Sequence, residues 1–239
     1  MNEKISVIAK NIMIFLLVVN VFIVFFVMYI NNDYKAYVSS NINYSFSINN
    51  ITVIIDDDFI NSNPGFNAKH YVKLLPKNYF VGLDTIYFVN QKNIILELYD
   101  KNKQFTTQAI YYKYERSIYV FDTQDTEFVL LHELGHHVHD SLMSNNEQKK
   151  YKYIFNNKNI FLREYTSTND DEGFADGFAC YYLSIKNKRV RMGEYYDKKL
   201  IKKVENNRFY SCIDEFTSDE KKFFDYVNKK YNVEVESYG

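Results

Sequence analysis

The run FVLLHELGHHVHD, residues 128–140, constrains the fold more than any other part of the chain. Its apolar residues predict a buried helix, on which His132 and His136 lie one turn apart on the same face. Two imidazoles in this arrangement can bind one Zn²⁺, which takes histidine nitrogen readily. Glu133, roughly 60° around the helix from His136, would lie beside the open position of the metal. The run therefore predicts a zinc centre in which Glu133 is the general base on zinc-bound water.

The neighbouring polar residues of this run need separate interpretations. His137 points away from the face of His132 and is expected to be a surface or core residue. His139 returns to that face after seven residues, so it is either a structural residue or one that acts from outside the ligand set or near the substrate. Asp140 lies near the same face and could accept the outer N–H of a ligand histidine.

A catalytic zinc also needs a third protein ligand and an open position. Glu172 and Asp176 follow downstream, and four residues on a predicted helix place both carboxylates on one face. Glu172 is the expected ligand, and Asp176 is expected to orient a zinc-bound histidine. Asp170 and Asp171 remain alternative ligands, although acidic residues here are equally typical of a helix N-terminus.

A second constraint is the uncharged apolar segment at residues 12–30, whose one polar residue is Asn20. A helix of this length spans roughly 28 Å, close to the thickness of the hydrocarbon core. Lys4 and Lys10 precede it, so the positive-inside rule places the N-terminus in the cytoplasm. Residues 1–30 are therefore expected to be a cytoplasmic stub and transmembrane signal anchor, with an extracytoplasmic domain on the cell membrane. The alternative is a cleaved signal peptide, which would make the protein secreted.

The sequence that follows residue 30 predicts one α+β domain. Residues 31–50 are polar and are expected to form a tether, and residues 51–239 a single domain with a small mixed sheet and helices that carry the site. Strands are expected at residues 51–55, 84–89 and 93–99, with a hairpin at 106–114 and 117–121. The strand at 117–121 could be the sheet edge on which an extended substrate lies. Helices are expected at residues 67–75, about 122–141, 172–185, 195–204 and 218–230.

Composition excludes several classes of protein. The net charge is −1, so a basic field for nucleic acid is absent and no nucleic-acid partner is expected. Aromatic residues make up 18% of the chain, which is ample material for a core. Two cysteines, Cys180 and Cys212, cannot form a disulfide framework, although they could pair with each other.

The segment from the first ligand helix to the second resembles the catalytic domain of anthrax lethal factor and its relatives, which include secreted Pro-Pro endopeptidases of clostridia. The resemblance covers about 50 residues. It is carried by His132-Glu133-Leu134-Gly135-His136, Val138, Asp140, Tyr165, Asn169 and Glu172-Gly-Phe-Ala-Asp176. Lethal factor has a longer Glu where this chain has Asp176, and its large non-catalytic domains have no counterpart here, so toxin activity does not follow.

The resemblance implies a zincin-like gluzincin metallopeptidase. His132, His136 and Glu172 would then bind zinc, with Glu133 as the general base. Tyr165, seven residues before Glu172, would hydrogen-bond the oxyanion or assist the leaving amine.

The expected function is that of a zinc-dependent endopeptidase acting on an extracytoplasmic protein or peptide, with residues 12–30 in the membrane. Two other classes remain open. One is a membrane-tethered, non-catalytic binding or immunity-type protein on a peptidase fold, and the other is a cytoplasmic regulatory protease.

Overall fold

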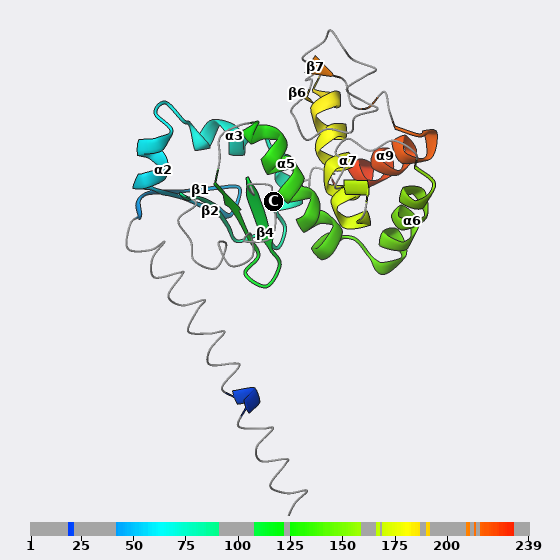
Figure 1. Ribbon diagram of the computed structural model, residues 1–239, viewed down its shortest axis with the longest axis horizontal. Coiled ribbons are helices and arrows are strands. Elements are labelled where there is room, and N and C mark those ends of the chain that lie inside the picture. The colour runs from blue at the N-terminus through cyan, green and yellow to red at the C-terminus, as the bar shows by residue number, and fades with distance from the viewer. Residues whose placement is uncertain are drawn as a thin grey trace, which may run out of the picture. The chain divides into compact units, whose positions relative to one another are not determined.

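The computed structural model describes residues 19–21, 42–90, 108–121, 125–158, 166–167, 169–186, 190–191, 209–210, 213 and 216–231. The chain divides into two compact units, residues 1–42 and 43–239. Apart from the first residue of the first strand, the sheet and helices described below belong to the second unit, which Figure 1 shows in colour.

The expected transmembrane helix at residues 12–30 lies outside the described residues, except for residues 19–21. In the part of the chain that the structure describes, no helix has both the length and the apolar character needed to cross a membrane. A span needs about 20 consecutive, mostly apolar residues in one helix. This finding corrects the single-pass anchor and the localisation at the cell membrane that rested on it.

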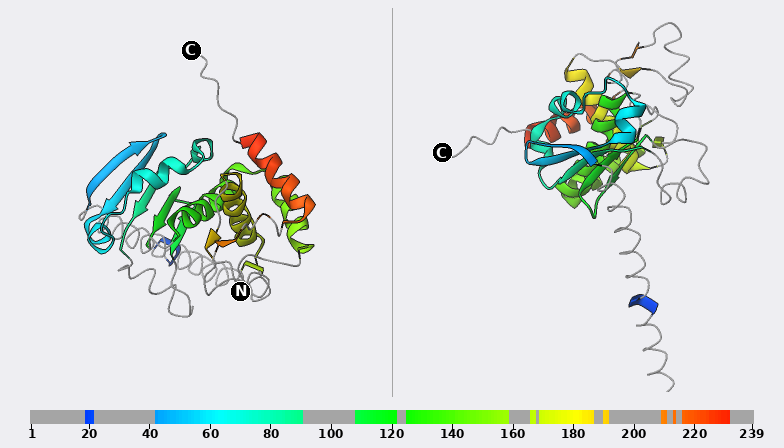
Figure 2. Two further views of the ribbon diagram at one scale, coloured as in Figure 1. Left: turned by 90° about the horizontal axis from the view of Figure 1, so that it is seen from above. Right: turned by 90° about the vertical axis from the view of Figure 1, so that its left-hand side faces the viewer.

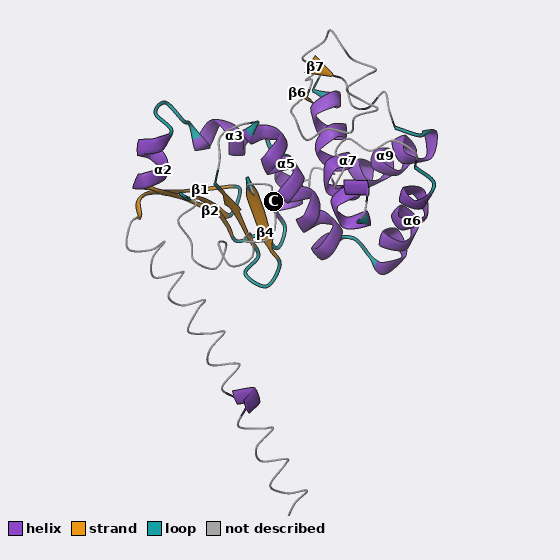
Figure 3. Cartoon of the chain, viewed as in Figure 1, coloured by secondary structure: helices purple, strands orange, loops and turns teal. Residues whose placement is uncertain are grey.

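A five-stranded sheet in the order β1-β2-β3-β5-β4 forms one layer of the domain (Figures 1 and 3). The strands β2 and β3 pair in parallel, as do β3 and β5, whereas β4 and β5 form the expected antiparallel hairpin. The strands are β1 (Ile42–Ile48), β2 (Ile51–Asp56), β3 (Thr85–Phe88), β4 (Ala109–Tyr112) and β5 (Ser117–Val120).

This topology corrects the expected α+β class to a mixed α/β fold. Parallel neighbours cannot be joined by a tight turn, so the chain must cross from the end of one strand to the start of the next. Between β2 and β3 this crossover carries α2 (Asp57–Ser62), α3 (Ala68–Leu74) and the 3₁₀ helix η1 (Lys77–Phe80). The sequence predicts only one helix there, at residues 67–75, and the α+β class assumes strands and helices in successive blocks.

The first hairpin lies partly within the segment expected to be a tether. Its turn, Asn49–Asn50, joins β1 to β2, and both residues have positive φ angles of 51° and 66°. A two-residue type I′ turn requires positive φ at both positions, and asparagine tolerates it. β1 therefore occupies Ile42–Ile48, inside the range 31–50.

Several expected helices are present, and their capping residues explain their bounds. α3 begins after Asn67, whose side chain accepts a hydrogen bond from the backbone of His70. α9 (Ser218–Tyr231) matches the expected helix at 218–230. The expected strand at 93–99 and helix at 195–204 lie outside the described residues.

α7 (Asp170–Ile185) begins after Asn169, whose side chain accepts a hydrogen bond from the Asp171 backbone. It agrees with the helix expected to carry Glu172 to Ile185. Cys180, near its C-terminal end, is buried and disulfide-bonded, and the other cysteine, Cys212, lies outside the described residues.

The helix α5 (Thr126–His137) lies between the sheet and a group of three helices, α6, α7 and α9 (Figures 1 and 2). It packs against β4 and β5 on one side and against α7 on the other. Leu130, Leu131 and Leu134 are fully buried as a result. The helix expected to be buried therefore brings its histidines to the boundary between the sheet layer and the helical group.

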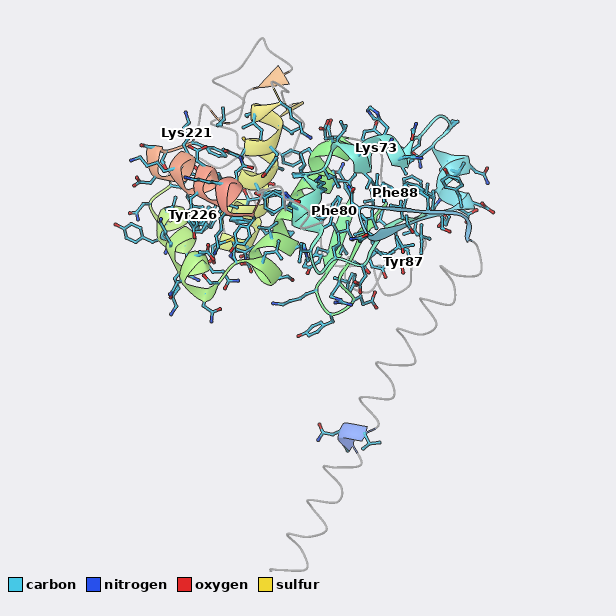
Figure 4. All side chains as sticks on the ribbon, turned by 180° about the vertical axis from the view of Figure 1, so that it is seen from behind. Lys73, Phe80, Tyr87, Phe88, Lys221 and Tyr226 are labelled. Atoms are coloured by element: carbon cyan, nitrogen blue, oxygen red, sulfur yellow. The ribbon has the colours of Figure 1, made fainter. Side chains whose placement is uncertain are left out.

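The helix α6 (Asn145–Asn156) was not expected, although the sequence carries its start signal. Ser144 and Glu147 form a capping box, in which each side chain bonds the backbone at the other's position. The Glu147 carboxylate also accepts hydrogen bonds from Tyr226, Lys230 and Tyr231 of α9. Figure 4 labels Tyr226, which lies where α9 meets α6. The Glu147 carboxylate thus caps the N-terminus of α6 and also binds α9 to α6 by hydrogen bonds.

Candidate metal centre

A glycine allows the two helices of the site to approach closely. A Cβ atom at Gly135 of α5 would lie 2.8 Å from the Cα of Ala175 and 3.2 Å from the Cβ of Phe178, both on α7. Backbone atoms cannot move away from such a contact without separating the helices. The glycine in the middle of the HELGH motif therefore sets the spacing at which side chains of α5 and α7 meet.

Three potential ligand atoms converge where α5 meets α7. The His132 Nε2 atom lies 3.2 Å from His136 Nε2 and 3.2 Å from Glu172 Oε2, and His136 Nε2 lies 3.6 Å from the same oxygen. Around a tetrahedral zinc ion bound at about 2.0–2.1 Å, ligand atoms are about 3.3 Å apart. The triangle therefore has the size that zinc requires, and it unites the three residues that the sequence proposed as ligands.

The protonation of the triangle also suits a cation. Asp176 Oδ1 lies 2.9 Å from His132 Nδ1, and both side chains are buried. The proton of His132 is therefore held on Nδ1, which leaves the Nε2 lone pair facing the triangle. The Glu172 Oε2 atom is buried and has no hydrogen-bond partner among the described residues. The His132 lone pair and the Glu172 oxygen therefore meet at a position that a cation would satisfy.

The charge of Glu172 fits the same interpretation. Burial raises the pKa of its carboxyl group, but protons on His132 and His136, which occupy the position of the cation in the metal-free site, lower the pKa more. The net pKa lies well below the ordinary value, so the carboxylate is ionised at neutral pH.

Of the two expected catalytic residues, the structure describes Glu133 but not Tyr165. Glu133 follows His132 on α5 and is 6% exposed. Tyr165 lies outside the described residues. The next residue, Thr166, is buried, and its carbonyl oxygen lies 3.6 Å from the position of a Cβ at Gly173, directly after Glu172. The chain therefore reaches the first turn of α7 one residue after Tyr165.

His137 is a core residue, one of the two alternatives expected for it. Its Nδ1 lies 3.0 Å from the hydroxyl of Tyr111, and its Nε2 lies 3.0 Å from the carbonyl oxygen of Val81. Burial lowers the pKa of His137, while the Val81 carbonyl and Asp140 oppose this shift. The neutral ring donates from Nε2 to Val81 and accepts at Nδ1 from Tyr111, which ties α5 to β4.

His139 lies, like His132, on the side of its helix that faces α7, within a stretch of wider winding. After α5 the chain continues as a π-helix, η2 (Val138–Leu142), in which the Met143 N–H donates to the Val138 carbonyl at 2.9 Å. The wider turn directs His139 Nδ1 toward Asp171 Oδ1 at 3.1 Å and Asp140 Oδ1 at 3.3 Å.

Asp140 consequently contacts His139, and the expected hydrogen bond to a ligand histidine is made by Asp176 instead. The contact with His139 lowers the pKa of Asp140, against a smaller opposing effect of burial.

Among the described strands, β4 is the sheet edge that packs against α5. The expectation that residues 117–121 form this edge is wrong, since β5 lies between β3 and β4. The parallel pairing of β3 with β5 joins segments far apart in the sequence, and hairpin signals carry no information about it.

A family model described as anthrax toxin lethal factor, N- and C-terminal domain, matches residues 90–196. The matched range includes α5, α6 and α7 and therefore all three residues of the triangle. Among curated proteins, none matches the chain. The lethal factor family consists of zinc metalloproteases. The resemblance inferred from the motifs is confirmed, and residues 90–196 carry a lethal factor-like domain.

Proposed function

We propose that this chain is a zinc-dependent endopeptidase that hydrolyses peptide bonds of a protein or peptide substrate. The observation that carries the proposal is the triangle of His132 Nε2, His136 Nε2 and Glu172 Oε2. Its separations of 3.2, 3.2 and 3.6 Å suit zinc. The lethal factor-like domain supports the same class of enzyme.

The three residues of the triangle would hold the metal, and Asp176 would keep His132 in the tautomer that binds it. Zinc, when bound, supplies Lewis-acid chemistry that polarises a carbonyl and lowers the pKa of water. Three protein ligands are typical of catalytic zinc sites, whereas structural sites use four. The ligand set therefore favours catalysis over a structural role.

Glu133 is the proposed general base. It takes a proton from the attacking water and later returns it to the leaving nitrogen. Its position next to His132 on α5 keeps its backbone at the edge of the triangle, and its burial keeps bulk water away from the carboxylate. Tyr165 is the proposed hydrogen-bond donor to the oxyanion, a role that rests on the resemblance to lethal factor.

An extended substrate would add to the free side of β4. Among the described strands β4 pairs with β5 alone, and α5 packs against it. Backbone hydrogen bonds to an edge strand hold a peptide in extended form and do not depend on its ends. This arrangement favours cleavage within a chain over removal of terminal residues.

The test compares Glu133→Gln with Glu127→Gln, which removes a partly buried carboxylate of α5 five residues before His132. Each protein is incubated with a diverse peptide library, and cleavage is read by mass spectrometry with zinc or with a chelator. We expect Glu133→Gln to retain zinc and lose roughly 10²–10⁴-fold in turnover. The parent and Glu127→Gln should cleave in a chelator-sensitive way.

Two results would contradict the proposal. One is undiminished cleavage by Glu133→Gln. The other is a folded, zinc-loaded parent that cleaves nothing in the library, which would favour a binding protein on a peptidase fold.

A further inference from the structure

A second cluster of side chains that can bind a metal lies close to the first, where the end of the α5 segment meets the start of α7. His139 and Asp140 belong to η2, and Asp171 belongs to the first turn of α7. One ligand atom from each lies within 4.8 Å of the others. The separations from His139 Nδ1 are 3.1 Å to Asp171 and 3.3 Å to Asp140. Ligand atoms around a cation bound at about 2.0–2.2 Å are about 3.0–3.5 Å apart, so these separations suit a shared cation.

The buried imidazole gives independent support for a ligand. His139 is 4% exposed, and its Nε2 atom has no hydrogen-bond partner within the described part of the chain. If a proton on Nδ1 bonded the two carboxylates, the Nε2 lone pair would be buried without a donor, which is costly. A cation at Nδ1 moves the proton to Nε2. The ring packs 5.2 Å from that of Phe174, whose π face can accept an N–H weakly but offers no N–H or O–H donor.

The charge of the cluster is also compensated only from a distance, by Lys113, whose charge acts on Asp140. In the described ranges, no lysine or arginine forms an ion pair with Asp140 or Asp171; the nearby Lys152 pairs with Asp170 instead. The Asp140 and Asp171 side chains are 31% and 48% exposed, so a cation can reach them from solvent. Two carboxylates around a neutral imidazole carry a charge of −2, which one divalent cation would neutralise.

We infer that His139, Asp140 and Asp171 form a second divalent-metal site, distinct from the triangle of His132, His136 and Glu172. One imidazole nitrogen with two carboxylates suits a transition metal such as Zn²⁺, whereas Ca²⁺ and Mg²⁺ prefer all-oxygen sites. The site shares no residue with the first. It cross-links η2 to the first turn of α7, the turn that also carries Glu172, and therefore helps to fix the geometry of the first site.

The test counts zinc ions by calorimetric titration of the metal-free full-length protein with Zn²⁺ in the presence of excess Ca²⁺ and Mg²⁺. We expect two equivalents per chain for the parent. Asp171→Asn should bind one equivalent tightly and the second at least a hundredfold more weakly. Its matched control is Asp170→Asn, which removes the same charge from the same helix turn and should keep two.

A variant of the first site completes the design. Glu172→Gln should retain the ion held by His139, Asp140 and Asp171, and so bind one equivalent. Should Asp171→Asn fail to fold, Asp140→Asn replaces it, since Asp140 lies outside α7.

The inference is overturned if the parent binds one ion, if Asp171→Asn binds as many as Asp170→Asn, or if Glu172→Gln binds none. No substrate is used, so failure here is separable from failure of the proposed peptidase. A chain that binds two ions and cleaves nothing supports the second site and contradicts the enzyme.

Discussion

Glu147 and Glu172 occupy the same position on two neighbouring helices, three residues after the N-caps Ser144 and Asn169. Burial raises the pKa of both carboxyl groups, yet in both the surrounding polar groups lower it well below the ordinary value. They differ in their neighbours. Glu147 accepts hydrogen bonds from backbone, hydroxyl and ammonium donors on α6 and α9. Glu172 faces two imidazole nitrogens, and its Oε2 has no donor among the described residues.

Residue type, helix position and a depressed pKa therefore do not separate a structural carboxylate from a proposed metal ligand. What separates the two carboxylates is the number of hydrogen-bond donors that the surrounding protein offers to each. Glu147 closes a capping box and is satisfied by protein groups alone. Glu172 lies in the same register, but its side chain turns toward the two histidines of α5, where a cation would satisfy it.

Replacing each carboxylate by its amide is the strongest test of this difference. Glu172→Gln removes an anionic ligand, so we expect zinc affinity to fall roughly a hundredfold or more, beyond the effect of losing an outer contact, and peptidase activity to fall with it. Glu147→Gln should bind zinc like the parent. Competition with a chromogenic chelator measures both affinities. Equal zinc affinity in the two variants would contradict the assignment of Glu172 as a ligand.

The helix contact that brings Glu172 to the histidines can be broken separately. In Gly135→Ala, the new Cβ meets the α7 backbone at Ala175. Overpacking of this kind costs about 1–3 kcal/mol, and we expect weaker zinc binding because the helices separate. Gly65→Ala is the control. Its φ of +85° strains any side chain, but no atom lies within 4 Å of the new Cβ. Thermal unfolding should show a loss in both variants, and zinc affinity should change only in Gly135→Ala.

The local parts of this site are readable from sequence. The spacing of His132 and His136 fixes their shared face, and Asn169 marks the start of α7. The start of α6 was equally readable from Ser144 and Glu147 but was missed. The site is predictable to this extent because capping and helical periodicity act over a few residues.

The parts that were not predicted depend on distant contacts or on unusual winding. The position of β5 inside the sheet follows from its pairing with β3, some 30 residues earlier in the chain. The contact of His139 with Asp171 follows from the way the π-helix η2 packs against α7, about 30 residues later in the chain. Neither feature leaves a short-range pattern in the sequence.

A smaller effect is expected from Asp176, which contacts the proposed metal ligand His132. Asp176→Asn removes the carboxylate that holds His132 Nδ1, and such a loss lowers metal affinity about 10–100-fold. The control is Tyr111→Phe, which removes a hydrogen bond to His137, the histidine that faces the sheet. That variant should cost about 1 kcal/mol of stability and leave zinc affinity unchanged. If both variants lowered zinc affinity alike, the assignment of His132 to the metal and of His137 to the sheet contact would be wrong.

The smallest effect, and the one specific to Glu147, is a change in the pH dependence of stability. Its folded pKa is lowered, so its contribution is present above the unfolded pKa of about 4.3 and is lost as pH falls through the lower folded value. Glu147→Gln should therefore cost about 1–3 kcal/mol at neutral pH and less in acid. Urea unfolding between pH 7 and pH 2 measures the difference. Asp219→Asn, a 75% exposed carboxylate paired with Lys222, should show no such dependence. A constant difference between parent and Glu147→Gln across this range would mean that the carboxylate acts through shape and not through charge.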